Sequence, residues 1–204
     1  QILTLGRVYK LSRGERLRLS LEQLGPIFVK FGQVMSTRRD LLPDDIAVEF
    51  AKLQDRVPPF SSDIAVATIE RAFGRPVSEI FESFDHVPVA SASIAQVHRA
   101  TLKDGREVVV KVRRPGIRPV IEADLRLLQR AAQLFEAQFP EWRQFQPVGV
   151  VKQFRASLML ELDLAAECRH AERIAANFEG HPEIVVPSVH WDFTSERVNV
   201  QDYI

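Results

Sequence analysis

The stretch "IAQVHRATLKDGREVVVKV" (residues 94–112) constrains the fold more than any other part of the chain. Two runs rich in β-branched residues flank a short polar segment, and such runs are typical of strands. Between them, Asp104–Gly105 supplies the positive φ angles of a tight turn. The stretch therefore predicts a β-hairpin and, with it, an antiparallel sheet.

Helical periodicity precedes this hairpin. Apolar residues recur at spacings of three and four from about residue 16 to residue 73, with an interruption at Gly25 and Pro26. One helix of this region is expected to begin near Pro43 and to stop at Pro58–Pro59. The next is expected to be capped by Ser61 or Ser62, with Gly74 and then Pro76 beyond its end.

Two longer helices, at about 117–139 and 148–178, are predicted after the hairpin. The segments "EIVVPSVHWDF" and "RVNVQDYI" then predict a second hairpin across "TSE". The order of helices, hairpin, helices and hairpin is typical of an α+β fold with an antiparallel sheet. We divide the chain into a helical extension, 1–84, and a sheet-containing domain, 85–204.

Composition excludes several classes of function. The 204 residues carry 27 basic and 27 acidic side chains, so a nucleic-acid partner is not expected. The single cysteine, Cys168, indicates a reducing compartment and is interpreted as a small thiol on a helix. No apolar run approaches the ~18 residues of a membrane span, so we expect a soluble chain. Because it starts at Gln1 and ends in a strand-like run, we expect it to be a fragment.

Lys111 is the first candidate for chemistry, because it lies between valines in "VVVKV". An isolated buried ammonium is costly to desolvate, so a lysine inside a sheet needs an anionic partner. The alternative is a lysine on an edge strand that reaches solvent.

The candidate partners lie in "ELDLAAE". On one continuous helix, Asp163 and Glu167 are four residues apart and share a face, whereas Glu161 points to nearly the opposite side. The alternative is that all three are ordinary solvated helix charges.

A third candidate region is "FVKFGQ", where Lys30 and Gln33 share a helical face. Gly32 costs roughly 1 kcal/mol relative to alanine inside a helix, which is tolerated where another backbone must approach closely. The alternative is that Lys30 and Gln33 are plain surface residues.

Four motifs occur in a fixed order: "KFGQ" at 30–33, "ASASIAQVH" at 90–98, "VVVKVRRPGI" at 108–117 and "ELD…E" at 161–167. Together they resemble the UbiB family of atypical protein-kinase-like proteins, most closely its bacterial members, over nearly the whole chain. The resemblance implies a kinase-like N-terminal lobe, ending near the hinge at the chain's last strand and preceded by a family-specific helical extension.

The resemblance also implies roles for residues. Lys111 matches the strand lysine that holds the α- and β-phosphates of ATP, and Glu167 matches its helix partner. The matching nucleotide loop, residues 90–93, carries no glycine and consists of Ala90, Ser91, Ala92 and Ser93. Because a Cβ disfavours positive φ, we expect this loop to close less tightly on phosphates, with an altered nucleotide pose or selectivity. Many relatives have alanine at position 91.

Four residues match a regulatory lid of the family: Lys30, Gln33, Glu161 and Asp163. Such a lid favours ATP hydrolysis or small-molecule chemistry over protein phosphorylation. The catalytic Asp and the Mg²⁺ ligands are expected in a C-terminal lobe that this chain lacks, so we expect the fragment alone to be inactive and assign it no metal site.

The resemblance implies an ATP-binding part of an atypical kinase or ATPase that supports ubiquinone biosynthesis at the cytoplasmic face of the inner membrane. The implied partners are nucleotide, ubiquinone-biosynthesis enzymes and lipid headgroups. The competing interpretation is a pseudokinase-like scaffold in which nucleotide is a conformational switch. Membrane contact by a basic amphipathic stretch is a further alternative, its cations being Arg7, Lys10, Arg13, Arg16 and Arg18.

Overall fold

The structure, a computed structural model, describes residues 11–54 and 57–204. Arg7 and Lys10 lie outside the described residues. The helices are α2 (Arg13–Leu24), α3 (Pro26–Ser36), α4 (Asp44–Phe50), α5 (Ser62–Phe73), α6 (Val77–Ile80), α7 (Ile117–Gln138), α8 (Pro147–Glu161) and α9 (Leu164–Asn177). Short 3-10 turns occur at Pro140–Phe145 (η1) and Trp191–Phe193 (η2). The strands are β1 (Phe81–Phe84), β2 (Ala90–Ser91), β3 (Ala95–Leu102), β4 (Glu107–Arg113) and β5 (Val198–Asp202).

The chain forms two compact units. The helical unit comprises Gln1–Arg56 and Ile121–Phe154, and the sheet unit comprises Val57–Val120 and Arg155–Ile204. These boundaries differ from the predicted division after residue 84. The reason is that α5, α6 and β1 precede that division but pack in the same core as the sheet.

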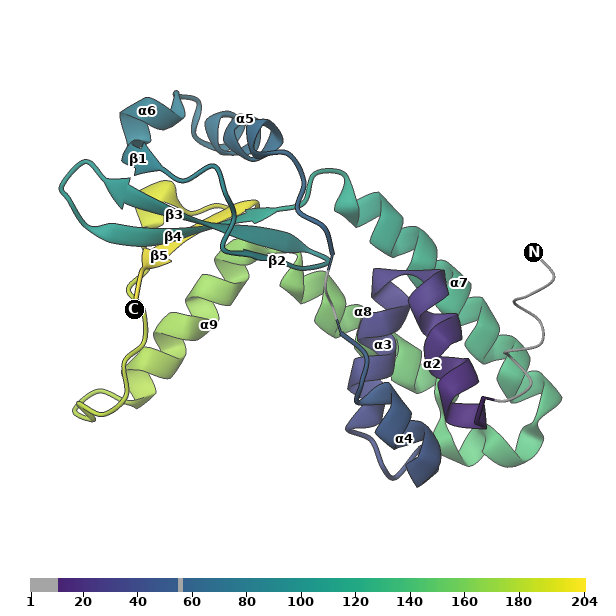
Figure 1. Ribbon diagram of the computed structural model, residues 1–204. Helices are drawn as coiled ribbons and strands as arrows, with labels where there is room; N and C mark the ends of the chain where they lie inside the picture. The colour runs from purple at the N-terminus through teal and green to yellow at the C-terminus, as the bar shows by residue number, and fades with distance from the viewer. Residues whose placement is uncertain (1–10, 55–56) are drawn as a thin grey trace. The chain divides into compact units, whose positions relative to one another are not determined.

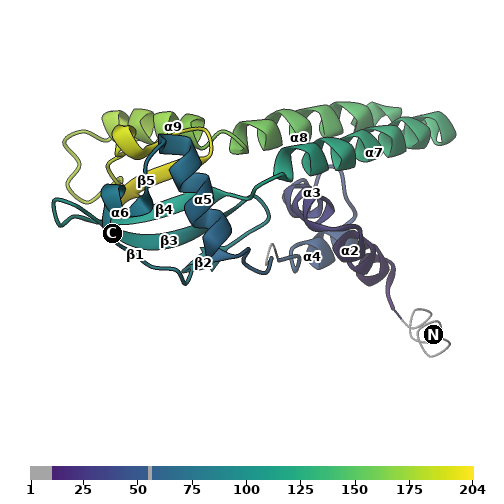
Figure 2. The same cartoon turned by 90° about the horizontal axis from the view of Figure 1, so that it is seen from above.

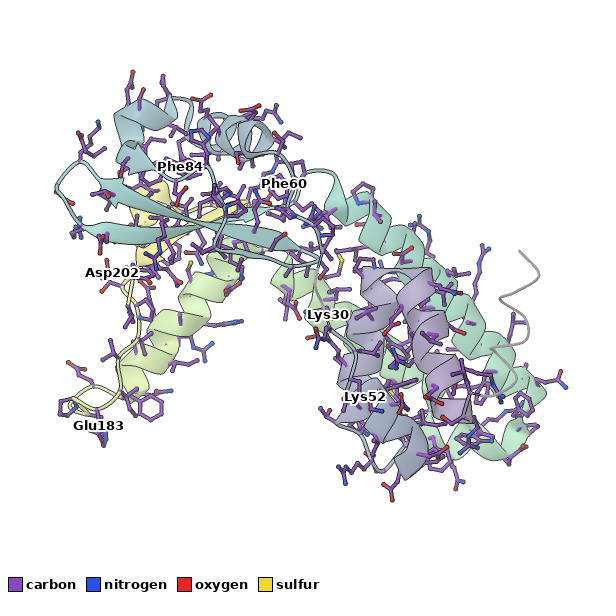
Figure 3. The ribbon with its side chains drawn as sticks, in the orientation of Figure 1. Lys30, Lys52, Phe60, Phe84, Glu183 and Asp202 are labelled. Carbon is purple, nitrogen blue, oxygen red and sulfur yellow. The ribbon has the colours of Figure 1, made fainter. Side chains whose placement is uncertain are left out.

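The sheet is antiparallel, as the sequence predicts, and the fold class is α+β. Its strand order is β1-β3-β4-β5, with β2 pairing to β3. Alternation along β4 turns Val108, Val110 and Val112 into a core that α5 and α6 complete. Figure 1 shows α5 on one face of the sheet and α9 on the other, and Figure 2 shows α5 lying across the strands. Phe60 and Phe84 pack against the α5 side of this core (Figure 3).

Two turn predictions need correction. Only Gly105 of the β3–β4 turn has a positive φ, 88°, and Asp104 instead accepts hydrogen bonds from Arg106 through its carboxylate. The second hairpin is shorter than predicted: one edge of β5 pairs along its length with β4, and the other edge is paired with the preceding segment only near Gln201. The segment before it contributes a single bridge, Val189 to Gln201. Pro187 lies two residues before that bridge and has no N–H to extend a ladder.

A buried polar network ties two connecting segments to β3. The side-chain oxygen of Gln96 accepts from the backbone N–H of Phe60 at 3.0 Å, so its amide nitrogen donates to Nε2 of His98 at 2.9 Å. Nδ1 of His98 then carries the hydrogen and donates to the carbonyl of Asp85 at 2.8 Å. His98 is fully buried, and burial holds its pKa below the usual histidine range.

This network predicts a pH dependence of stability. Below about pH 6.5 the unfolded chain protonates His98 while the folded chain does not, so the free energy of unfolding falls as the pH is lowered. His98→Gln keeps a neutral donor and acceptor and is expected to remove part of this dependence. The measurement is urea unfolding at about pH 7 and about pH 5.5. A His170→Gln control, on the exposed surface of α9, should behave as wild type. Equal pH dependence in all three proteins would contradict the assignment.

The helical unit begins with a capped helix. Ser12 and Glu15 form a reciprocal capping box at the start of α2, three residues before the predicted periodicity. A core formed by α3 and α4 includes Val29, Met35, Ile46, Phe50 and Leu53. Arg13 pairs with Asp45 at 2.8 Å and Arg18 with Glu49 at 3.1 Å, so two cations of the basic amphipathic stretch contact α4.

Helix limits follow the caps more closely than the prolines. α4 ends at Phe50, not at the predicted Pro58–Pro59, and the chain then turns so that Leu53 is buried. α5 has Ser61 as its N-cap and Gly74, at φ 69°, as its C-cap, which confirms that prediction. Among the described helices, none combines the length and the apolar character needed to cross a bilayer.

Gly14 brings α2 and α4 together. A Cβ at this position would lie 2.6 Å from the carbonyl oxygen of Asp45 and 2.9 Å from Cγ of Glu49. Since the first contact is with backbone, the clash cannot be relieved by rotating a side chain.

Gly14→Ala is therefore expected to lower the free energy of unfolding of the helical unit by about 1–3 kcal/mol. The matched control is Gly149→Ala in α8, where a Cβ meets only ordinary contacts at 3.4 Å or more. That change should leave stability unchanged or raise it by up to about 1 kcal/mol. Urea unfolding followed by fluorescence of Trp142, in a Trp191→Phe background, measures both. A stable Gly14→Ala protein would show that the helices separate without cost.

Candidate nucleotide site

Lys111 and Glu167 form the predicted ion pair. Nζ of Lys111 lies 2.8 and 2.7 Å from the two carboxylate oxygens of Glu167, in the first turn of α9. The lysine is not buried as expected, because β4 turns its valines to the core and Lys111 to the opposite face. Its side chain is 32% exposed and that of Glu167 is 45% exposed. At this exposure the pair contributes little to stability and chiefly fixes the position of the ammonium.

The predicted continuous helix at 148–178 is wrong. α8 ends at Glu161, and Asp163 is the N-cap of α9, its carboxylate accepting from the backbone N–H of Ala166 at 3.1 Å. A second oxygen of Asp163 pairs with Arg169 at 3.2 Å. The argument from helical faces for Glu161 and Asp163 therefore fails, because an N-cap residue lies outside the helical repeat.

Arg113 holds the break between α8 and α9. Its guanidinium donates to the carbonyl oxygens of Leu162 and Glu196, and it pairs with the Glu196 carboxylate at 3.4 Å. Leu164 donates its backbone N–H to the same Glu196 carbonyl. These contacts fix the start of α9, and hence Glu167, against β4 and β5.

The loop without glycine has an extended backbone. Ala90 and Ser91 form β2, opposite Val97 and Gln96 of β3, and Ala92 closes the turn through a 2.9 Å backbone bond to Ala95. In the part of the chain that the structure describes, Gln146 is the one non-glycine residue with a positive φ. Residues 90–93 thus adopt conformations that alanine and serine accept, and no position in this turn requires glycine.

Arg114 positions this loop, a residue that sequence reasoning missed. Its Nη2 lies 3.3 Å from Oγ of Ser91 and 3.2 Å from the carbonyl oxygen of Ala92. The same nitrogen lies 3.1 Å from the carbonyl oxygen of Pro58, and the guanidinium stacks over Phe60 at 5.1 Å. The doubled arginine in "VRRPG" is the only signal of it in the sequence.

Asn199 is the second missed residue. Strand register aligns Ala90, Val97, Lys111 and Asn199 across one face of the sheet. Asn199 is 2% exposed, and its Oδ1 finds no hydrogen-bond partner within the described residues. A buried acceptor without a donor is unusual in a folded protein. The signal was a polar residue between valines in "VNV", the pattern that singled out Lys111.

The remaining predicted residues lie on α3. Lys30 and Gln33 are on α3, where Gln33 donates to the carbonyl of Leu53 at 3.1 Å. Gly32 is approached closely by side chains and not, as expected, by another backbone: a Cβ there would lie within 2.7 Å of side-chain methyl carbons of Leu53 and Leu21. Asp202, at the end of β5 (Figure 3), pairs with Nε2 of His190 at 2.7 Å, and this hydrogen bond lowers the pKa of its carboxyl.

Cys168 is a buried thiol on α9, as the sequence indicates. Burial raises its pKa to about 11, so it is a protonated packing residue beside the ion pair. Among residues 11–54 and 57–204, no group of three or more histidine, cysteine, aspartate and glutamate side chains is arranged to hold a metal ion.

Comparison with known proteins agrees with these features. Residues 52–204 match the family model of the ABC1 atypical kinase-like domain. The chain is 53% identical over 195 residues to "Probable protein kinase UbiB" of Marinobacter nauticus and 52% identical over 195 residues to that of Pseudomonas fluorescens. Each alignment covers 96% of this chain and 36% of the relative, so the chain spans little more than a third of their length.

A solved structure is also similar. It is titled the complex structure of Rv3197-erythromycin from Mycobacterium tuberculosis, and its TM-score to this chain is 0.56 at 30% sequence identity. The match covers 85% of this chain and 43% of that one. The family model extends over most of the chain, including the Lys111–Glu167 pair and the loop at 90–93. The chain therefore belongs to the UbiB family of ABC1 atypical kinase-like proteins.

Proposed function

We propose that this chain is the nucleotide-binding part of an atypical kinase or ATPase. The observation that carries the proposal is the ammonium of Lys111, held by both oxygens of Glu167 on the face of the sheet where α9 lies. Two of the three ammonium hydrogens point to the carboxylate, and the third remains for a phosphate oxygen. Glu167 thus orients a cation toward a ligand, as in kinases.

The surrounding residues fit ATP. Ala90, at the start of the loop without glycine, and Lys111 lie in one register across the strands. Arg114 holds the backbone of this loop in place. Mg²⁺ would supply charge neutralisation at the phosphates, and we assign no residue of this chain to it. A catalytic Asp and the metal ligands belong, in this proposal, to the remainder of the longer relatives.

The wider role follows from the family. We include in the proposal support of ubiquinone biosynthesis at the cytoplasmic face of the inner membrane, with biosynthetic enzymes and lipid headgroups as partners. The lid role of Lys30, Gln33, Glu161 and Asp163 is part of it. A scaffold that uses nucleotide only as a switch is the second candidate.

Calorimetric titration with ATP and ADP tests nucleotide binding directly. Wild type should bind saturably, and Lys111→Met should bind at least about tenfold more weakly, since a hydrogen bond to a charged group is worth about 1.5–3 kcal/mol. The control is Lys103→Met, which removes a lysine paired with Glu82 at the far end of the hairpin. Equal affinity in all three proteins would overturn the proposal. Steady-state turnover by the complete protein then distinguishes the enzyme from the scaffold.

A further inference from the structure

A second basic site lies in the sheet unit, at the end of β4. A cavity of about 290 Å³ is bounded by the turn from β4 into α7, by α5 and by the residues that precede β5. Its charged lining consists of Arg71, Arg113, Arg114, Arg118, Arg197 and Glu196. Five guanidinium groups therefore surround one carboxylate.

The carboxylate does not neutralise this cluster. Glu196 is shared by Arg113 at 3.4 Å and Arg197 at 3.3 Å. Within the described ranges, Arg71 and Arg118 have no carboxylate at ion-pair distance. Burial, together with the neighbouring charges of Arg197 and Arg118, lowers the pKa of Arg113 in spite of Glu196. The cavity is thus under-neutralised, and an anion inside it would relieve the repulsion between arginines.

The five arginines differ in whether backbone carbonyl oxygens already hold their guanidinium groups. Arg113 and Arg114 are committed to backbone carbonyls of the α8–α9 junction and of the 90–93 loop. Arg71, Arg118 and Arg197 are exposed and come from three separate segments, α5, the first turn of α7 and the approach to β5. Three guanidinium groups on exposed side chains around one cavity suit an anion with several oxygens, because each guanidinium can bind phosphate through two parallel hydrogen bonds.

Two further features favour phosphate. The first turn of α7 lies in the cavity wall, where Ile117 donates its backbone N–H to the carbonyl of Arg114 and Pro119 has none, so the N–H of Arg118 is the one left to favour an anion. The cavity volume of about 290 Å³ corresponds to several water molecules, each of which occupies about 30 Å³ in the liquid, so it is larger than a single small ion needs. Space therefore remains for the group that carries the phosphate.

We propose that this cavity is a phosphate-binding site, with Arg71, Arg118 and Arg197 as its ligands, separate from the nucleotide site at Lys111. It receives a phosphate or diphosphate group borne by a soluble metabolite or by a lipid headgroup. Arg113 connects the two sites, because the side chain that lines the cavity also holds the start of α9, which carries Glu167. Occupancy is thereby expected to affect the Lys111–Glu167 pair.

The test uses pyrophosphate as the probe, titrated calorimetrically into wild type, Arg71→Gln/Arg118→Gln and a charge-matched control, Arg130→Gln/Arg173→Gln. The control arginines are exposed on α7 and α9 and do not line the cavity. We expect at least a tenfold loss of affinity in the first double variant and none in the control. The same titration of Lys111→Met should retain the binding, which separates this site from the nucleotide site.

A second arm separates the sources of phosphate. Vesicles of phosphatidylcholine with phosphatidic acid are co-sedimented with the same proteins, with and without pyrophosphate. Vesicle binding that the Arg71/Arg118 variant loses supports the site with a lipid source. Pyrophosphate binding with no vesicle binding supports it with a soluble source. If both double variants bind equally in both assays, or if Lys111→Met alone abolishes binding, the site does not exist as proposed.

Discussion

Glu167→Gln is expected to weaken ATP binding by roughly 10- to 100-fold, although Glu167 itself need not touch the nucleotide. The neutral amide offers one acceptor oxygen and turns an N–H₂ toward Nζ of Lys111, so the bidentate hold at 2.8 and 2.7 Å is lost. The ammonium then samples several rotamers, and each phosphate contact is made at an entropic cost.

A double-mutant cycle with Lys111→Met distinguishes orientation from direct contact. If Glu167 acts only through Lys111, the double variant loses no more affinity than Lys111→Met alone. Stability should hardly change, because half-exposed ion pairs contribute about 0–1 kcal/mol. Calorimetry measures the affinities and urea unfolding the stabilities. Strictly additive losses of affinity would show that Glu167 contributes to nucleotide binding directly and not through Lys111.

Arg113→Met should be the most destabilising single change of those considered, lowering the free energy of unfolding of the sheet unit by about 3 kcal/mol. Arg113 is 9% exposed. Methionine can occupy the space of its aliphatic side-chain carbons but offers no hydrogen-bond donor. The carbonyl oxygen of Leu162 would lose its charged partner, while that of Glu196 would keep the N–H of Leu164. A buried acceptor left without a donor costs about 1–3 kcal/mol.

Fluorescence of Trp191 follows this unit, because its indole donates to Glu172 of α9 at 2.6 Å. A Trp142→Phe background removes the signal of the helical unit. The matched control is Arg118→Met, which takes the same charge from the same cavity at an exposed position and should cost less than about 0.5 kcal/mol. Equal destabilisation by the two changes would mean that charge, and not the buried hydrogen bonds, is what Arg113 contributes.

The sequence by itself determined one hairpin, both ends of one helix and one long-range pair. The β-branched runs around "KDG" specified the β3–β4 hairpin, and Ser61 and Gly74 specified both ends of α5. Lys111 was found to need a carboxylate because a charged residue between valines is an anomaly in a strand pattern, and the family motif identified which one. These inferences succeed because strand alternation, helical periodicity and capping depend on neighbours a few residues apart.

Only the tertiary structure decided the rest. The break at Leu162, the partners of Arg113 and Arg114, the buried Oδ1 of Asn199 and the cavity at Arg71 all join segments distant in sequence. Arg113 contacts Leu162 across 49 residues and Glu196 across 83. An arginine has no periodic signature, since its long side chain reaches many partners from a given backbone position. Its partner is set by the path of the chain around the sheet, and no local pattern encodes that path.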